Sequence, residues 1–159
     1  MNKYVFFLDI DETLITDGKI PNENIYAVNE ARRKGNFVFI NTGRSPAFIP
    51  DWLIRSVEID GFAASSGAYI KIGDKIVLSE HIPIETVIKN AQFIEKIGRQ
   101  CLFEGSDKLV VMNPKGKTEF EIANGANDFL DKYKNLDVEI INLSGKIFTC
   151  RKKIFFHVL

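Results

Sequence analysis

The first third of the chain alternates continuous apolar runs with segments of helical spacing. The apolar runs occupy residues 4–8, 37–40 and 61–64, and the helical patterns between them cover residues 22–34 and about 45–53. Continuous apolar runs are typical of strands that are covered on both faces, as in parallel sheets. The order strand, helix, strand, helix, strand therefore predicts an α/β fold whose parallel sheet is joined by right-handed crossovers.

Turn and capping residues set the expected ends of these elements. Asp17 and Gly18 form a hairpin-turn dipeptide, which predicts a short ribbon over residues 14–20. Gly35 is placed to end the first helix. Ser45 is placed to cap the second helix, with Pro46 at its first position, and this helix is expected to continue through Phe48, Trp52 and Leu53.

The pattern changes after Gly67, where a hairpin replaces the crossover units. We expect a domain boundary near Ser66, with a core domain at residues 1–67 and a mixed α+β domain at residues 68–159. The expected elements of the second domain are a hairpin of strands 68–72 and 75–80, helices 84–98 and 118–133, and strands 101–104, 109–112, 138–141, 146–150 and 154–159.

Composition narrows the class of protein. The chain has 159 residues, of which 45% are hydrophobic, enough for one ordinary core or a core with a small insert. Its formal net charge of zero gives no electrostatic reason to expect nucleic acid or an anionic membrane as a partner. No apolar run approaches the roughly 18 residues of a membrane span. Two cysteines without a metal-ligand spacing favour reduced thiols in a cytoplasmic protein.

Two acids, Asp9 and Asp11, follow the first apolar run directly. In an open parallel sheet the crevice at the carboxyl ends of the strands is where active sites are built. A carboxylate there can attack an electrophile or bind a metal, and a second acid can serve as general acid and base. Thr13 adds a hydroxyl donor two residues later.

A second polar cluster, Thr42, Gly43 and Arg44, follows the second apolar run. A hydroxyl, an unhindered glycine amide and the start of a helix suit an oxyanion such as phosphate. Acids at strand ends often only cap turns, and a lone glycine is more often a plain turn residue. Both clusters at the same end of one sheet favour a functional site.

The segments "DIDET", "FINTGRS" and "FAASSGAYI" resemble the haloacid dehalogenase (HAD) superfamily, specifically its Cof-like phosphatases with a large α/β cap. The resemblance is specific over residues 4–70 and a matter of pattern beyond. It implies a Rossmannoid parallel sheet, of which three core strands are present, with an inserted cap domain. It also implies a magnesium-dependent phosphatase that hydrolyses a small phosphorylated metabolite, such as a sugar phosphate.

The same resemblance implies the residue roles. Asp9 would form an aspartyl-phosphate, and Asp11 would protonate the leaving group and then activate water. Thr13 and Thr42 would hold the phosphoryl oxygens, with Gly43 and Arg44 completing the substrate-binding set. Mg²⁺ would be bound by the Asp9 carboxylate and the Asp11 main-chain carbonyl, and the cap would select the substrate.

The chain departs from the family pattern in three ways. Glu12 stands where glycine is usual, and Ser66 where asparagine is common. More seriously, neither the later phosphate-steadying lysine nor a G-D-x-x-x-D loop follows the cap, so we expect a chain truncated after the cap. An inactive remnant that serves as a binding or oligomerisation module therefore stays open, as does an unrelated α/β binding domain.

A missing fourth core strand would leave residues 4–8 as an apolar sheet edge. Such edges pair readily with other chains. Either a homo-oligomer covers this edge, or the C-terminal run 154–159 returns from the cap to pair with it. The position of that run in the order of elements favours association.

Overall fold

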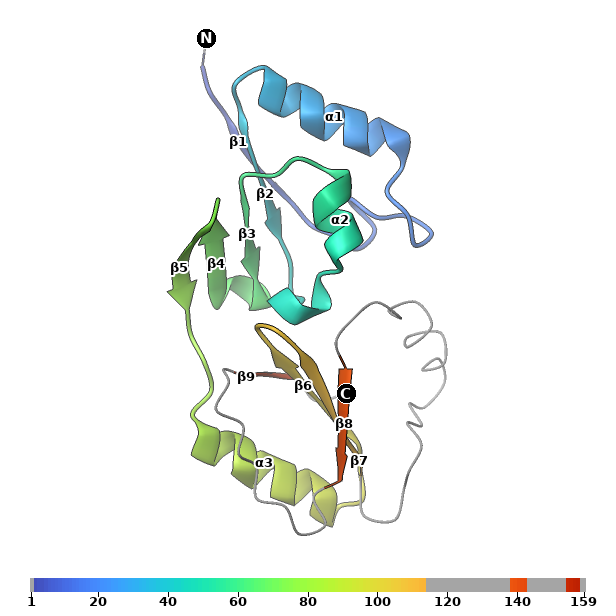
Figure 1. Cartoon of the computed structure of the whole chain (residues 1–159), viewed down its shortest axis with the longest axis vertical. Coiled ribbons are helices and arrows are strands. Elements are labelled where there is room, and N and C mark those ends of the chain that lie inside the picture. Colours follow the sequence, from blue (N-terminus) through green and yellow to red (C-terminus); the bar gives the residue numbers. More distant parts are fainter. Residues whose placement is uncertain (1, 114–137, 143–153, 158–159) are drawn as a thin grey trace. The chain divides into compact units, whose positions relative to one another are not determined.

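The computed structural model describes residues 2–113, 138–142 and 154–157, and the chain divides into two compact units, Met1–Glu80 and His81–Leu159 (Figure 1). The first unit contains a five-stranded sheet in the order β1-β2-β3-β4-β5. Its elements are β1 (Val5–Leu8), α1 (Asn22–Arg33), β2 (Phe37–Asn41), the 3-10 turn η1 (Pro46–Phe48), α2 (Asp51–Ser56), β3 (Gly61–Ala64), the 3-10 turn η2 (Ser65–Gly67), β4 (Tyr69–Ile72) and β5 (Lys75–Ser79).

The expected parallel α/β sheet is confirmed in β1, β2 and β3. Leu8 pairs with Ile40, and Asn41 pairs with Ala63, both in parallel register. The carboxyl ends of the three strands therefore lie at one edge of the sheet. The loops that carry both polar clusters start from this edge.

Two turns follow from local sequence as expected. Asp17 and Gly18 both have positive φ, 52° and 74°, and Thr16 and Lys19 exchange backbone hydrogen bonds of 2.9 and 3.2 Å across them. Positive φ at both central residues is the geometry that favours Asp-Gly in tight hairpins. Gly35, at φ 83°, ends α1 and donates its amide to the Arg32 carbonyl at 2.8 Å.

The helix expected over residues 45–53 is wrong in extent. It is divided into η1 and α2, and Ser45 makes no side-chain capping bond. Pro50 explains the break, because proline has no amide to donate and disfavours helical backbone at the residue before it. Ile49 accordingly adopts an extended conformation, with φ −94° and ψ 111°.

The hairpin at residues 69–79 belongs to the first unit, whereas the sequence pattern assigned it to the second. Strand β4 pairs antiparallel with β3, with Ala64 opposite Tyr69, and β5 pairs with β4. The pairing satisfies the backbone groups on the free side of β3 and buries both Ala64 and Tyr69. The compact unit therefore continues to Glu80 and does not end at residue 67.

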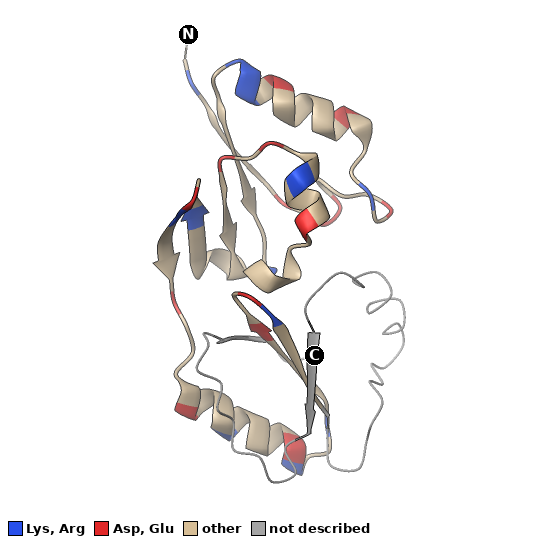
Figure 2. Cartoon of the chain, in the orientation of Figure 1, with Lys and Arg blue, Asp and Glu red and all other residues tan. Residues whose placement is uncertain are grey.

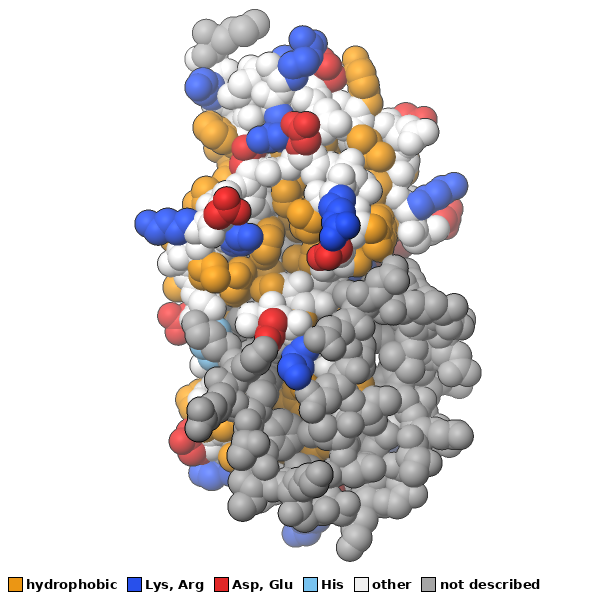
Figure 3. Space-filling model, in the orientation of Figure 1, with side chains coloured by type: hydrophobic (Ala, Val, Ile, Leu, Met, Phe, Trp, Pro, Cys, Tyr) orange, Lys and Arg blue, Asp and Glu red, His pale blue; other side chains and the backbone are white. Residues whose placement is uncertain are grey.

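Strand β1 forms where expected but is not buried. Phe6 is 42% exposed and Phe7 61% exposed, although they point to opposite faces of the strand. The reason is position: within the described residues β1 pairs only with β2 and so forms an edge of the sheet. Apolar side chains are visible over the surface of the first unit in Figure 3.

The second unit has a four-stranded sheet in the order β8-β7-β6-β9 and the helix α3. Residues 154–157 pair with β6, so this run does not return to β1. The expected helix at 118–133 and strand at 146–150 lie outside the described residues. The elements are α3 (Ile84–Lys96), β6 (Cys101–Gly105), β7 (Leu109–Asn113), β8 (Val138–Asn142) and β9 (Ile154–His157).

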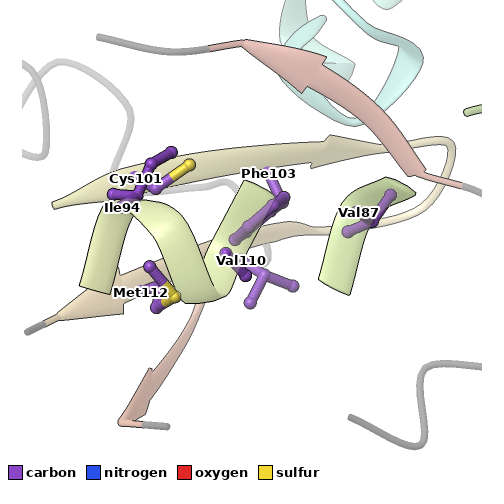
Figure 4. Close-up of a cluster of buried hydrophobic side chains, with 7 residues drawn as sticks. Val87, Ile94, Cys101, Phe103, Val110 and Met112 are labelled. Carbon is purple, nitrogen blue, oxygen red and sulfur yellow. The ribbon is translucent and has the colours of Figure 1, made fainter. Parts of the chain in front are cut away.

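One face of α3 packs against β6 and β7. The buried cluster contains only apolar side chains and one thiol, as Figure 4 shows: Val87, Ala91, Ile94, Cys101, Phe103, Val110 and Met112. Burial raises the pKa of the Cys101 thiol to about 11, so this cysteine stays protonated and unreactive at neutral pH. None of the helices in the described residues is long and apolar enough to span a bilayer.

Asp60 links several elements by hydrogen bonds at the opposite edge of the first sheet, where β2 and β3 begin. Its carboxylate accepts the Val38 amide at 2.8 Å and both Nε and Nη2 of Arg32 at 3.2 and 2.9 Å. Its carbonyl accepts the Gly73 amide at 2.8 Å. The guanidinium of Arg32 is the main cause that lowers the pKa of Asp60, with a smaller contribution from the Val38 amide.

Candidate functional site

The loop after β1 presents its polar side chains because its apolar ones are buried. Ile10 is fully buried and Leu14 nearly so, whereas Asp9, Asp11 and Thr13 are exposed. The Leu14 amide donates to the carbonyls of Asp9 and Ile10 at 3.2 and 3.1 Å, which closes a wide helical turn. The two acids therefore lie on a loop that is anchored by the buried side chains of Ile10 and Leu14.

Asp9 lies directly past the end of β1. One of its carboxylate oxygens accepts the amide of Ile10 at 2.8 Å, and the side chain is otherwise open. Glu12, three residues on, has φ 57°, a left-handed conformation that glycine adopts without cost. A glycine, the residue that the family resemblance implies at this position, would adopt this geometry without strain.

Asn24, on the first turn of α1, holds the same loop from the other side. Its Nδ2 donates to the carbonyls of Thr13 and Leu14 at 3.1 and 3.2 Å. Both bonds go to the backbone, so they fix the position of the main chain that bears the Thr13 hydroxyl. Nothing in the sequence pattern pointed to this residue, because an asparagine near a helix start is ordinary.

The loop after β2 is built around Thr42, which is buried. Its amide donates to the Ala63 carbonyl at 3.0 Å and its carbonyl accepts the Ser66 amide at 3.1 Å. Its hydroxyl oxygen accepts the Arg44 amide at 3.2 Å. Gly43 between them is exposed, and a Cβ there would lie 3.8 Å from the Ser66 hydroxyl oxygen, an ordinary contact.

A third loop, after β3, joins the site although the sequence interpretation gave it no role. Ser65 and Ser66 both adopt left-handed backbone, with φ 51° and 54°, which is uncommon for serine. The Ser65 amide donates to the Arg44 carbonyl at 2.8 Å. The loops after β2 and β3 are thus joined by backbone hydrogen bonds.

Arg44 connects the two predicted clusters. Its Nε and Nη2 donate to the two carboxylate oxygens of Asp11, at 2.9 and 2.5 Å. The expectation that the acids and the Thr42 loop meet at the carboxyl edge is borne out by this contact. The contact also means that Arg44 already has a protein carboxylate as its partner.

The loop after β1 carries the residues predicted to bind a cation, Asp9 and Asp11. No group of three or more His, Cys, Asp or Glu side chains that could hold a metal occurs among the residues that the structure describes. Mg²⁺ commonly keeps several waters and uses one or two carboxylates with substrate phosphates. Asp9 and Asp11, the two residues predicted to hold it, both lie on this loop. Charges of both signs are interspersed over the described ribbon (Figure 2).

Comparison with known proteins decides the family. The model for haloacid dehalogenase-like hydrolases matches residues 6–156. The chain belongs to this family. The structure of a HAD subclass IIB sugar phosphatase superposes on this HAD-like chain with a TM-score of 0.68 and 29% identity, covering 89% of this chain and 53% of that one. The resemblance read from the three sequence segments is thereby confirmed.

Two further relatives agree with this assignment. YkrA of Bacillus subtilis (strain 168), provisionally named a phosphatase, is 30% identical over 95 residues, which cover 57% of this chain and 37% of YkrA. A hypothetical protein of Geobacillus kaustophilus HTA426 shares the fold, with a TM-score of 0.73 and 22% identity over 98% of this chain and 56% of that one. This HAD-like chain thus spans about half the length of the solved relatives, and less of YkrA.

Proposed function

We propose that this HAD-like chain hydrolyses a small phosphorylated metabolite, of the sugar phosphate class, with the help of Mg²⁺. The observation that carries the proposal is the contact between Asp11 and Arg44. It joins a loop with a carboxylate nucleophile to a loop with oxyanion-binding groups, at the sheet edge where active sites form. The sugar phosphatase named above supports the substrate class.

Asp9 is the nucleophile in this proposal. Its open carboxylate oxygen attacks phosphorus, and the bond from phosphorus to the leaving-group oxygen breaks. Asp11 delivers a proton to that oxygen and then takes one from the water that hydrolyses the aspartyl-phosphate. Thr13, Thr42 and the Gly43 amide would hold the phosphoryl oxygens.

A bound Mg²⁺ would offset the repulsion between the Asp9 carboxylate and the phosphate dianion. The residues that would hold it are the Asp9 carboxylate and the Asp11 main-chain carbonyl. The second unit would act as the cap that selects the substrate and excludes water.

A second candidate is a chain that binds phosphorylated ligands without turning them over. It is favoured by the small number of acidic ligands among the described residues. Incubation with Mg²⁺ and p-nitrophenyl phosphate separates the two functions. Release of p-nitrophenolate that is lost in Asp9→Asn supports the phosphatase, whereas equal background release by both proteins supports the binding module.

We also propose that the chain associates with itself through β1. One support is the exposed apolar edge that includes Phe6 and Phe7. The other is that β9 pairs with β6, so β9 does not cover the edge of β1. Light scattering at micromolar concentration should show a dimer or larger species. Phe6→Lys should shift it toward the monomer, and a wild-type chain that is monomeric at these concentrations would exclude this association.

A further inference from the structure

Arg44 is held by the protein at both its guanidinium and its backbone. The residue is nearly buried, at 8% exposure, and its Cζ lies 5.3 Å from the centroid of the Phe48 ring. Its Nη1 donates to the Phe48 carbonyl at 3.4 Å, and its amide and carbonyl bond to Thr42 and Ser65 at 3.2 and 2.8 Å. The direction of the guanidinium is therefore set by the fold.

The Nε and Nη2 edge of this guanidinium meets Asp11. The contact is side-on, through Nε and Nη2, one to each carboxylate oxygen. Bidentate pairs of this kind fix geometry as well as adding energy. The two partners differ in exposure, because the Asp11 side chain is 54% exposed and that of Arg44 only 7%.

The Asp11 carboxylate has more acceptor positions than the Arg44 fork uses. A carboxylate offers about four lone-pair positions, and the Arg44 fork uses one on each oxygen. The exposed half of the side chain leaves the others open to a substrate. The Asp11 carboxylate is thus held in place by Arg44 and still has acceptor positions for a substrate.

We propose that Arg44 is a positioning residue that aims the Asp11 carboxylate at the leaving-group oxygen. The inference rests on the proposed phosphatase function, since it gives Asp11 the acid role. It changes the part that the sequence predicted for Arg44, from holding the substrate to holding a residue that acts on it.

Two other roles for Arg44 make different predictions. As a substrate ligand it would bind the phosphoryl group directly, and its loss would raise KM for every phosphate ester. As a simple link between two loops it would affect stability, and its loss would lower kcat equally for all substrates. Only a positioning role predicts that the loss of kcat depends on the leaving group.

The kinetic test compares Arg44→Gln with wild type on p-nitrophenyl phosphate and on glycerol 2-phosphate. An alkoxide needs a proton to leave and p-nitrophenolate hardly does, so kcat should fall at least about tenfold further on the alkyl ester, with KM little changed. Asp11→Asn should show the same selectivity, and the double variant should be no worse than Asp11→Asn alone. Raised KM on both esters, or equal losses of kcat, would overturn the proposal.

Arg44→Lys and Arg55→Gln are the matched variants. Lysine keeps the charge but not the planar fork, so Arg44→Lys should retain part of the kcat on the alkyl ester that Arg44→Gln loses. Arg55 pairs with Asp51 on the exposed surface of α2, at 3.2 Å, so Arg55→Gln makes the same charge change without touching Asp11. We expect wild-type kinetics for Arg55→Gln.

A second measurement does not depend on turnover. A crystal structure of Arg44→Gln should show the Asp11 side chain in more than one conformation, while calorimetry with inorganic phosphate should give an affinity within about twofold of wild type. If wild type hydrolyses neither ester, the proposed function fails and this measurement still decides the inference. A single, unchanged Asp11 conformer in Arg44→Gln would overturn it.

Discussion

Gly61, the first residue of β3, has no room for a side chain. It lies between Phe39 of β2 and Ile72 of β4, and a Cβ built on it would lie 2.1 Å from the Lys71 carbonyl oxygen and 3.0 Å from the Ile72 Cα. Carbon and oxygen in close contact lie about 3.3 Å apart, so β4 would have to move by roughly 1 Å. Gly61→Ala therefore tests how firmly the hairpin is part of the first sheet.

The cost follows from two terms. Overpacking a well-filled site costs about 1–3 kcal/mol, and a strained or lost hydrogen bond at the β3–β4 pair adds about 1 kcal/mol. The reduced entropy of the unfolded chain returns about 0.4–1 kcal/mol. We expect Gly61→Ala to lower the free energy of unfolding by about 2–3 kcal/mol, a large part of an ordinary domain's 5–15 kcal/mol.

Urea unfolding followed by Trp52 fluorescence provides the assay, because the only tryptophan of the chain lies on α2 in the first unit. Gly43→Ala is the matched control. Its Cβ would make only an ordinary 3.8 Å contact, so its unfolding free energy should stay within about 0.5 kcal/mol of wild type. A change that small for Gly61→Ala would refute the close approach of β3 and β4.

Three further outcomes are expected. Asp9→Asn should abolish turnover of every ester, whereas Asp11→Asn should cost about 10²-fold or more on alkyl phosphates and less on p-nitrophenyl phosphate; equal losses on both would contradict the acid role. Mg²⁺ should bind more weakly than micromolar in calorimetry, because only two protein oxygens among the described residues are predicted to hold it; submicromolar affinity would reveal a missed ligand. Because Arg32 lowers the pKa of Asp60 below 3.8, this pair stabilises the fold above that pH and the stabilisation is lost as pH falls through the lowered value. Asp60→Asn should thus cost about 1 kcal/mol at pH 7 and progressively less below pH 4; a cost that does not change with pH would exclude this origin.

The parts of the fold that were predictable are those set by neighbouring residues. The Asp17-Gly18 turn and the end of α1 at Gly35 each depend on a backbone conformation that few residues adopt, so the sequence marks them directly. Pro50 carries equally local information, and the helix expected across it was wrong because apolar spacing was given more weight than the missing amide. The membership of β4 in the first sheet depends on a distant partner, β3, which no local pattern specifies.

The candidate site shows the same division. Asp9, Asp11 and Thr42 were predicted as site residues because polar clusters follow two successive apolar runs at the same edge of one sheet. The actual partner of Arg44 could not be read from the sequence, since the two residues of the ion pair are separated by 33 positions and the fork direction depends on Phe48. Asn24 was missed for a similar reason, because it acts by donating to two backbone carbonyls, which every residue type provides.

The Asp60 network lies at the amino ends of β2 and β3, and the acids lie beyond the carboxyl end of β1. Substitutions at these two ends should therefore have different consequences in a cell. A change at Asp60 or Arg32 lowers the fraction of folded chains, and proteases would then reduce the steady-state abundance of the protein. A change at Asp9 leaves the folded fraction and the abundance intact. A variant library scored for both cellular abundance and turnover should thus separate into two groups that map to opposite edges of one small sheet.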